Sequence, residues 1–323
     1  MPIRTGYARA MMDLRQLSMF RVVVEQGSFS AAARALHCTQ PAVSQQMKAL
    51  ERSVGGPLFI RVGRGLRLTE AGTALSHHAK EILDGAASAH QRVRAIAASE
   101  LDSIRLCAFP SANAALVPRA AAKLRQDSPG LRLELLEHEP PDSHHALRRA
   151  ECDLVVAFTY PAADRQAADD GLLEVPLLDE PLMLLVPADH PMARRSPAVL
   201  AELAGETWIA GCPRCRDEFV TACADSGFEP AIACATDDNL AIQALVAAGL
   251  GVAMVPALVL SSLRHPDVVA LPIDPLVRRR VSAYTWPDLV RSATIRSVIE
   301  ALRAAATQLP GIGMGIRGLT PAG

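Results

Sequence analysis

The spacing of apolar residues near the N-terminus predicts three short helices. The first helix is indicated by apolar side chains three and four positions apart, at Leu17, Phe20, Val23 and Val24. Ser28 then supplies a side-chain oxygen that caps a second helix, through an alanine-rich run that ends at Leu36. Thr39 is a good N-cap for a third helix, and Pro41 falls in its first turn, where no backbone donor is required. Three short helices with a tight turn between the last two predict a helix-turn-helix.

The third predicted helix has one apolar face and one polar face. At about 100° per residue, a narrow apolar stripe contains Val43, Met47, Leu50 and Val54. The opposite face presents Pro41, Ser44, Gln45, Lys48 and Arg52. Amides, a hydroxyl and cations without a carboxylate suit the base edges and phosphates of a DNA major groove. The alternative is an ordinary solvated helix face, which has the same pattern.

Basic residues follow in a short segment that contains glycines. Arg61, Arg64 and Arg67 alternate there with glycines and leucines before Thr69. The pattern predicts a small hairpin, either a basic wing that lies against phosphates or a plain solvated hairpin. Residues 1–70 contain ten Lys and Arg against four Asp and Glu, a net charge of +6, and the remainder carries −7. A basic head on an acidic body is expected when a nucleic-acid-binding domain is joined to another domain.

A proline-free helical run extends from Thr69 to about Ser99. Its apolar positions keep a strict four-three spacing over three heptads, at Leu75, Ala79, Ile82, Ala86, Ala89, Val93 and Ile96. This seam predicts a coiled coil, and a single helix lying on its own domain is the alternative. A symmetric dimer would suit a pseudo-palindromic DNA site, because two recognition helices must enter grooves a helical turn apart.

After Ser99 the pattern changes to alternating strands and helices. Strands are expected at 104–109, 131–137 and 153–158, with helices at 116–126 and around Leu147. This order predicts a parallel sheet covered by helices. A second lobe is expected from strands at 182–186, 208–210, 232–235 and 252–255, with helices at 217–225 and 240–248. A strand at 281–284 and a helix at 294–309 return to the first lobe, and 310–323 form a loose Gly/Pro tail.

The predicted strand ends supply candidate ligand-binding residues, because ligands bind beyond the carboxyl ends of strands in open parallel sheets. The candidates are Ser111, Asn113, Thr159, Gly211 and Cys212. Ser111 and Asn113 stand before a predicted helix N-terminus, a natural place for an anionic or carbonyl group. The alternative is that these two residues only cap the helix.

Residues 1–16 show no signal peptide, so the seven cysteines are expected to be reduced thiols in the cytoplasm. Cys38 is expected to be a small buried hydrophobe. Residues 244–261 are uncharged and almost long enough to span a bilayer. Gly249, Gly251 and Pro256 interrupt this segment, which favours a helix, a short buried strand and a new helix over a membrane span.

Two other classes of function fit the sequence less well. The chain lacks a Gly-x-Ser-x-Gly motif, a P-loop and a His-Glu-x-x-His motif, so no enzyme is predicted. No cofactor is predicted either. A solute-binding protein would explain two lobes, but it would not explain the basic head and the heptads. The sequence therefore favours a DNA-binding protein that responds to a small molecule.

Four motifs, in order and spacing, resemble LysR-type transcriptional regulators. They are Gly27-Ser-Phe-Ser-Ala-Ala-Ala-Arg-Ala-Leu36, Thr39-Gln-Pro-Ala-Val-Ser-Gln-Gln-Met-Lys-Ala-Leu-Glu51, Gly56-Pro-Leu-Phe-Ile-Arg61 and Leu68-Thr-Glu-Ala-Gly72. The resemblance implies a winged helix-turn-helix at 12–70, a linker (dimerisation) helix at 71–100 and a two-lobed, periplasmic-binding-protein-like α/β effector domain at 103–309. The fold class is thus α+β and multi-domain. The eleven residues before Met12 depart from the family pattern and leave the start residue open.

The resemblance also implies roles for residues and partners. By position, Gln40, Pro41, Ser44 and Gln45 match residues that approach bases, while Arg34, Lys48 and the wing arginines match phosphate contacts. Ser28 and Arg52 complete the candidate DNA-binding set. The implied partners are double-stranded DNA, a small-molecule effector in the cleft between the lobes, and further copies of the chain in a homodimer or homotetramer.

The segment Cys212-Pro-Arg-Cys215 suggests an alternative, a regulator that senses redox changes. Zinc would need four ligands, and no second pair follows at suitable spacing. Cys215 precedes Arg216 at an expected helix start, a setting that lowers a thiol pKa. It resembles the family's peroxide-sensing branch, which implies Cys215 and Cys223 as the reactive thiols, although the spacing differs by one residue. Ordinary packing or loop cysteines are the other interpretation.

Overall fold

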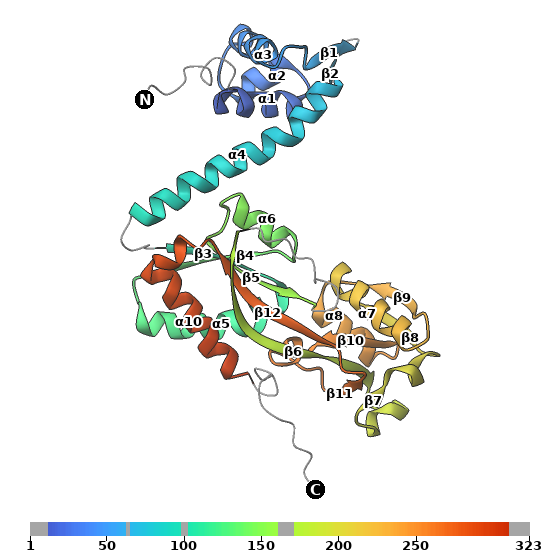
Figure 1. Ribbon diagram of the computed structural model, residues 1–323. Coiled ribbons are helices and arrows are strands. Elements are labelled where there is room, and N and C mark those ends of the chain that lie inside the picture. Colours follow the sequence, from blue (N-terminus) through green and yellow to red (C-terminus); the bar gives the residue numbers. More distant parts are fainter. Residues whose placement is uncertain (1–11, 63–64, 98–102, 161–170, 310–323) are drawn as a thin grey trace. The chain divides into compact units, whose positions relative to one another are not determined.

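The computed structural model describes residues 12–62, 65–97, 103–160 and 171–309, and it divides into two compact units with the main boundary near residue 91 (Figure 1). Each unit has its own core. The predictions made for the first eleven residues, for Arg64 in the wing and for the tail at 310–323 lie outside the described residues.

The N-terminal unit contains the predicted helix-turn-helix. Its elements are α1 (Leu14–Gln26), α2 (Phe29–Ala35), α3 (Gln40–Val54), β1 (Phe59–Val62), β2 (Gly65–Leu68) and α4 (Glu70–Ala97). The predicted apolar stripe packs into the core except at Val54, which is 40% exposed because α3 ends there, before the left-handed Gly55. The Ser28 hydroxyl accepts a hydrogen bond from the backbone N–H of Ala31 at 3.1 Å and caps α2 as predicted. Thr39 occupies the N-cap position of α3 but makes no side-chain capping bond there.

Two contacts fix α3 and α4 against the wing. The wing is an antiparallel hairpin of β1 and β2, as the sequence predicted. The Glu51 carboxylate on α3 accepts the backbone N–H of Leu58 at 2.9 Å. At the start of α4 a Cβ added to Gly72 would overlap the carbonyl oxygen of Leu58, so only glycine fits.

Cys38 is exposed, which corrects the expectation of a buried thiol, because the turn after α2 leaves it outside the core.

The linker helix α4 uses part of its apolar seam within the unit. Leu75 and Ala79 are buried in the core formed by α1, α2 and α3, and Leu83 packs against that core. By contrast, Ile82 is 40% exposed and Val93 is 65% exposed. The start of the helix therefore lies on its own domain, which was the alternative interpretation, and the exposed later positions are those left for the predicted coiled coil.

The C-terminal unit is built on one mixed sheet in the order β4-β3-β5-β12-β6-β10-β8-β9. The strands are β3 (Ser103–Ala108), β4 (Arg132–Glu137), β5 (Leu154–Thr159), β6 (Leu173–Pro187), β8 (Thr207–Ala210), β9 (Ala231–Ala235), β10 (Val252–Pro256) and β12 (Arg278–Thr285), with β7 (Ala198–Val199) and β11 (Val268–Asp274) at the side. The β4-β3-β5 and β10-β8-β9 sets are parallel, which confirms the two predicted lobes. The antiparallel β6 and β12 join them.

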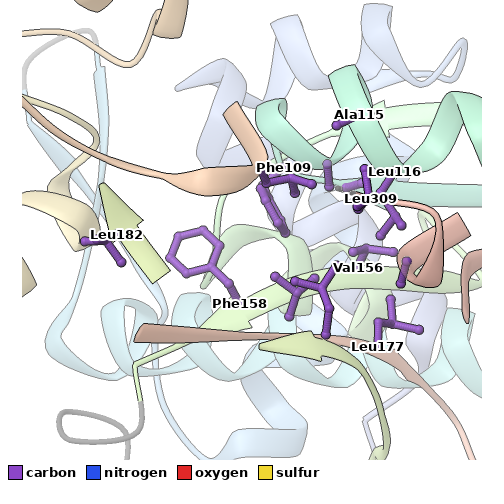
Figure 2. Close-up of a cluster of buried hydrophobic side chains, with 14 of the residues drawn as sticks. Phe109, Ala115, Leu116, Val156, Phe158, Leu177, Leu182 and Leu309 are labelled. Carbon is purple, nitrogen blue, oxygen red and sulfur yellow. The ribbon is translucent and has the colours of Figure 1, made fainter. Parts of the chain in front are cut away.

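Helices cover this sheet in both lobes. They are α5 (Pro110–Asp127), α6 (Asp142–Arg148), α7 (Pro213–Asp225), α8 (Asn239–Ala247), α9 (Ala257–Leu260) and α10 (Ala293–Thr307). α10 packs beside α5, and the core beneath them includes Phe109 and Phe158, whose ring centroids lie 5.0 Å apart (Figure 2). Within the described parts of the chain, no helix combines the length and the apolar character that a bilayer crossing requires.

Several elements are longer than the sequence predicted, among them β6, β12, α5 and α7. β6 begins at Leu173 instead of 182, because its first half pairs with β12 while its second half pairs with β10 and β11. α5 begins at Pro110 instead of 116, and α7 begins at Pro213 instead of 217. In both helices a proline occupies the first turn, where the missing N–H costs no hydrogen bond. These longer elements change which residues face the candidate binding pocket of the C-terminal unit.

Candidate functional site

The exposed face of α3 and the loop that follows it form a groove of about 950 Å³. Six of the predicted residues line it together: Gln40, Pro41, Ser44, Gln45, Lys48 and Arg52. Glu51 also lines it, but its carboxylate is bound to the backbone N–H groups of Leu58 and Phe59. The groove thus presents amide, hydroxyl and cationic groups, which is the combination that contacts DNA bases and phosphates.

The remaining predicted DNA-binding residues lie on neighbouring elements. Arg34 is exposed in the last turn of α2, and Arg67 is exposed on β2. Arg61 is part of β1, but its side chain lies outside the described part of the chain. Ser28 is half-buried, and its hydroxyl is used by the helix cap.

The C-terminal unit contains a pocket of about 680 Å³ between its two lobes. The start of α5 and the end of β4 form one wall, and the start of α8 with the segment after α9 forms the other. Its lining consists of Pro110, Ser111, Ala114, Glu137, His138, Glu139, Asp237, Asp238, Asn239, Leu240, Gln243, Val259, Ser262 and Leu263. A concave site that mixes apolar walls with a few polar groups is typical of small-molecule binding.

Of the five ligand-binding residues predicted from strand ends, Ser111 is the one in this lining. Asn113 lies one turn inside α5, where its Nδ2 donates to Glu137 Oε2 at 3.1 Å and to the carbonyl of Ala108 at 3.2 Å. Thr159 ends β5, and Gly211 follows β8. Phe109 is the N-cap of α5, so the expectation that Ser111 or Asn113 caps this helix is wrong. The reason is that α5 starts earlier than the apolar pattern indicates.

A buried ion pair lies directly behind Ser111, and the sequence did not reveal it. Arg279 on β12 donates from Nε to Glu180 Oε1 on β6 at 2.7 Å, and its second terminal nitrogen donates to Ser111 Oγ at 3.0 Å. The other Glu180 oxygen accepts the backbone N–H of Leu258 at 2.6 Å. The guanidinium also lies over the Phe109 ring, 4.8 Å from its centroid. This network joins α5, β6, β12 and α9 beneath the pocket.

Comparison with known families finds a match in each of the two units. Residues 14–73 match the family described as "Bacterial regulatory helix-turn-helix protein, lysR family", and residues 97–307 match "LysR substrate binding domain". The second match alone spans more than half of the chain. The chain belongs to the LysR family of transcriptional regulators. It is therefore a DNA-binding regulator with an effector-binding domain, and its family comprises regulators and not enzymes.

This LysR-family regulator resembles characterised proteins along most of its length. It is 33% identical over 306 residues to the SDS degradation transcriptional activation protein of a Pseudomonas species, with 91% of this chain and 95% of that protein covered. It is 27% identical over 299 residues to the hydrogen peroxide-inducible genes activator of Escherichia coli, again with 91% and 95% covered. Full-length CbnR in complex with its target DNA matches with a TM-score of 0.61 and 25% identity, over 91% of this chain and 100% of that chain.

The thiols of this LysR-family regulator are arranged differently from the predicted redox pair. Cys215 and Cys223 lie eight residues apart on α7, which places their Cα atoms about 12 Å apart, whereas a disulfide needs less than about 7 Å. Cys223 is buried in the core, and burial raises its pKa to about 12. Cys212 is instead the neighbour of Cys215, with the two Sγ atoms 2.9 Å apart. Cys212, and not Cys223, is therefore the thiol next to Cys215 in this structure.

Cys212 and Cys215 have opposite protonation preferences. The hydrogen bond from Cys212 and the charge of Arg279 lower the pKa of Cys215, although burial opposes them. Conversely, the bond to Cys215 and burial raise the pKa of Cys212. The Cys212 Sγ also lies 3.7 Å from Oε2 of Glu139, a residue of the pocket lining. Among the described residues, no group of three or more His, Cys, Asp and Glu side chains is placed to hold a metal ion.

Proposed function

We propose that the chain acts in the cytoplasm as a homodimer or homotetramer that binds a pseudo-palindromic promoter site, and that a small-molecule effector in the C-terminal pocket alters the geometry of the oligomer. The observation that carries the DNA-binding part is the groove on α3, where all the predicted base-contacting and adjacent cationic side chains come together. An effector changes DNA binding only when it binds one arrangement of the oligomer more tightly than another, with a coupling of about 1–3 kcal/mol.

We assign base recognition chiefly to Gln45, which is exposed in the middle of the groove. A glutamine amide can form two hydrogen bonds to an adenine edge in the major groove. The substitution Gln45→Ala is expected to cost about 1–3 kcal/mol on the native promoter site while non-specific DNA binding stays nearly unchanged. The measurement is a pair of titrations with native and random DNA at one salt concentration.

Gln46→Ala is the matched control for this prediction. Gln46 is exposed next to Gln45 on α3, but it lies outside the groove lining and accepts a hydrogen bond from Gln16 at 3.3 Å. Its loss should leave both DNA affinities unchanged. Equal losses on native and random DNA for Gln45→Ala would show that Gln45 does not read bases.

The effector part of the proposal rests on the pocket between the lobes. Ser111 brings the predicted hydroxyl to its wall, and the buried Gln243 lies opposite on α8. Asn113 is placed to act indirectly, because it holds the Glu137 carboxylate at the rim. Thr159, Gly211 and Cys212 stay candidates on the adjoining strand ends. Cys212 is linked to the pocket by the contact of its sulfur with the Glu139 carboxylate.

A second candidate function is redox sensing, and the 2.9 Å distance between the Cys212 and Cys215 sulfur atoms favours it. A disulfide requires a sulfur separation of about 2.05 Å, so a small approach suffices. A hydroperoxide is the oxidant in this scheme. The Cys215 thiolate attacks one peroxide oxygen, the O–O bond breaks, and an alcohol or water leaves. The Cys212 thiol then displaces water from the resulting sulfenic acid, so that two thiols and one hydroperoxide give one disulfide, water and the alcohol.

Hydrogen peroxide is therefore expected to convert Cys212 and Cys215 into one disulfide and to shift the promoter footprint of the full chain. Peptide mass spectrometry should find the cross-link between these two residues, and a reductant should reverse both changes. Cys212→Ser and Cys215→Ser should each abolish the shift. Cys223→Ser should leave it intact, because that thiol is buried in the core. A footprint shift that survives Cys212→Ser would exclude this pair as the sensor.

A further inference from the structure

We propose that the effector is an organic cation, a protonated amine with an apolar body. This inference rests on the proposed function of the pocket and adds the chemical class of its ligand. The charged groups of the lining are the carboxylates of Glu137, Glu139, Asp237 and Asp238. Among the described residues that form the walls, none is Lys or Arg, and His138 is the basic side chain present. An anionic ligand would therefore meet several like charges without an opposing cation.

The nearest arginine, Arg279, is already paired with a carboxylate of the chain. Arg279 lies behind Ser111, but its side chain is only 2% exposed and its charge is paired with the fully buried Glu180. The guanidinium is also enclosed by aromatic rings, with the Phe158 centroid 4.4 Å away. Glu180 neutralises this guanidinium from one oxygen and holds the backbone N–H of Leu258 with the other. In the pocket lining, Ser111 is the residue that hydrogen-bonds to Arg279, through its neutral hydroxyl.

Most N–H donors at the two helix N-termini of the pocket are used by hydrogen bonds within the chain. Helix N-termini attract anions through free N–H groups. At α8 the Asp238 carboxylate accepts the N–H groups of Leu240 and Ala241, at 2.8 and 3.3 Å. At α5 the first residue is Pro110, which has no N–H, and the N–H groups of Ala112 and Asn113 bind the carbonyl of Phe109. The two ends therefore offer few donors to a carboxylate or a phosphate.

The carboxylates of the lining include one pair that a cation would stabilise. Burial raises the pKa of Glu139, the charge of Arg279 and the hydrogen bond with Cys212 lower it, and repulsion from the charges of Asp237, on the opposite wall, and Glu137 raises it again. Burial and a neighbouring negative charge both disfavour the ionised form of a carboxyl group. A ligand ammonium between Glu139 and Asp237 would remove this repulsion. The two residues come from different lobes, so the same contact would hold the lobes together.

The remaining walls define the rest of the ligand. Apolar side chains cover both lobes of the pocket: Pro110, Ala114, Leu240, Val259 and Leu263. Such walls favour a hydrocarbon or aromatic body next to the ammonium group. A volume of about 680 Å³ accommodates a metabolite of this kind and excludes a large polymer.

Three probes with one common body test the charge class: phenethylammonium, phenethyl alcohol and phenylacetate. Each is titrated calorimetrically into the full chain. Phenethylammonium is expected to bind about tenfold more tightly than phenylacetate, a difference that corresponds to one charge-assisted contact, with the alcohol between them. Asp237→Asn should weaken the binding of phenethylammonium and leave the affinity for phenethyl alcohol unchanged. Asp225→Asn, at an exposed position on α7 outside the pocket, is the matched control.

Ala114→Trp separates the charge class from the site itself. Ala114 is an exposed part of the lining, so a tryptophan there fills the pocket without disturbing the core. Loss of ammonium binding in this variant supports the inference. If phenylacetate binds as tightly as phenethylammonium and Ala114→Trp abolishes its binding, the cationic ligand class is overturned and the pocket stays the effector site. If Ala114→Trp has no effect on binding, the pocket is overturned as the effector site. If phenethylammonium does not bind, the cationic ligand class is overturned.

Discussion

Glu180→Ala is expected to lower the free energy of unfolding of the C-terminal domain by about 3–5 kcal/mol, because it leaves Arg279 buried without its counter-charge. Glu180 is fully buried, and both of its carboxylate oxygens are used, one by Arg279 and one by the N–H of Leu258. Urea denaturation followed by tryptophan fluorescence measures the effect selectively. Both tryptophans of the chain, Trp208 and Trp286, belong to this domain.

The adjacent residue on β6 supplies the control. Asp179 pairs with Arg280 at 2.9 Å, but these side chains are 31% and 47% exposed. Asp179→Ala should therefore cost no more than about 1 kcal/mol, as exposed ion pairs do. The double variant Glu180→Leu with Arg279→Met should recover most of the loss, because a buried pair replaced by apolar groups is often neutral. Similar losses for Glu180→Ala and Asp179→Ala would contradict the assigned role of burial.

The DNA-binding half of the structure was predictable because its signals are local. Ser28 caps its helix three residues away, and the stripe of Val43, Met47 and Leu50 is buried as the helical period requires. The face opposite that stripe is then exposed by geometry alone. The family motifs indicated the same residues independently of the helical pattern. The predictions that failed here are the burial of Val54 and of Cys38, which are both exposed. Both residues lie at chain turns, where the helical period gives no information.

The proposed effector pocket was only partly predictable because its walls come from distant segments. Strand ends pointed to Ser111, which lines the pocket, but Glu139 and Asp237 are brought to the same pocket only by the packing of the two lobes on β6 and β12. Glu137 ends an edge strand whose side chains are largely exposed, so its sequence resembles an ordinary solvated surface. Similarly, Arg279 lies between two other arginines, and nothing in that run indicates which one is buried. Such information arises from tertiary packing.

Ile82→Asp is expected to convert the proposed dimer into a monomer and to lower the affinity for a paired half-site by about 10²-fold or more, the contribution of bivalent binding. Leu75 and Ala79 are already buried within their own domain, so a partner helix has to use the exposed positions of α4, including Ile82 and Val93. An aspartate in that seam would lose water when the helices associate, which is strongly unfavourable for an unpaired charge. Sedimentation gives the dimer dissociation constant, and titrations with single and paired half-sites give the DNA affinities.

Ala87→Asp introduces the same charge at an exposed position of α4 that lies outside the heptad seam. It should leave the dimer and the DNA affinities unchanged. Affinity for a single half-site should be unaffected in both variants, because neither residue belongs to the core around α1, α2 and α3. A dimer of unchanged stability in Ile82→Asp would place the interface on another surface. The start of α4 would then support only its own domain, since its buried residues already pack there.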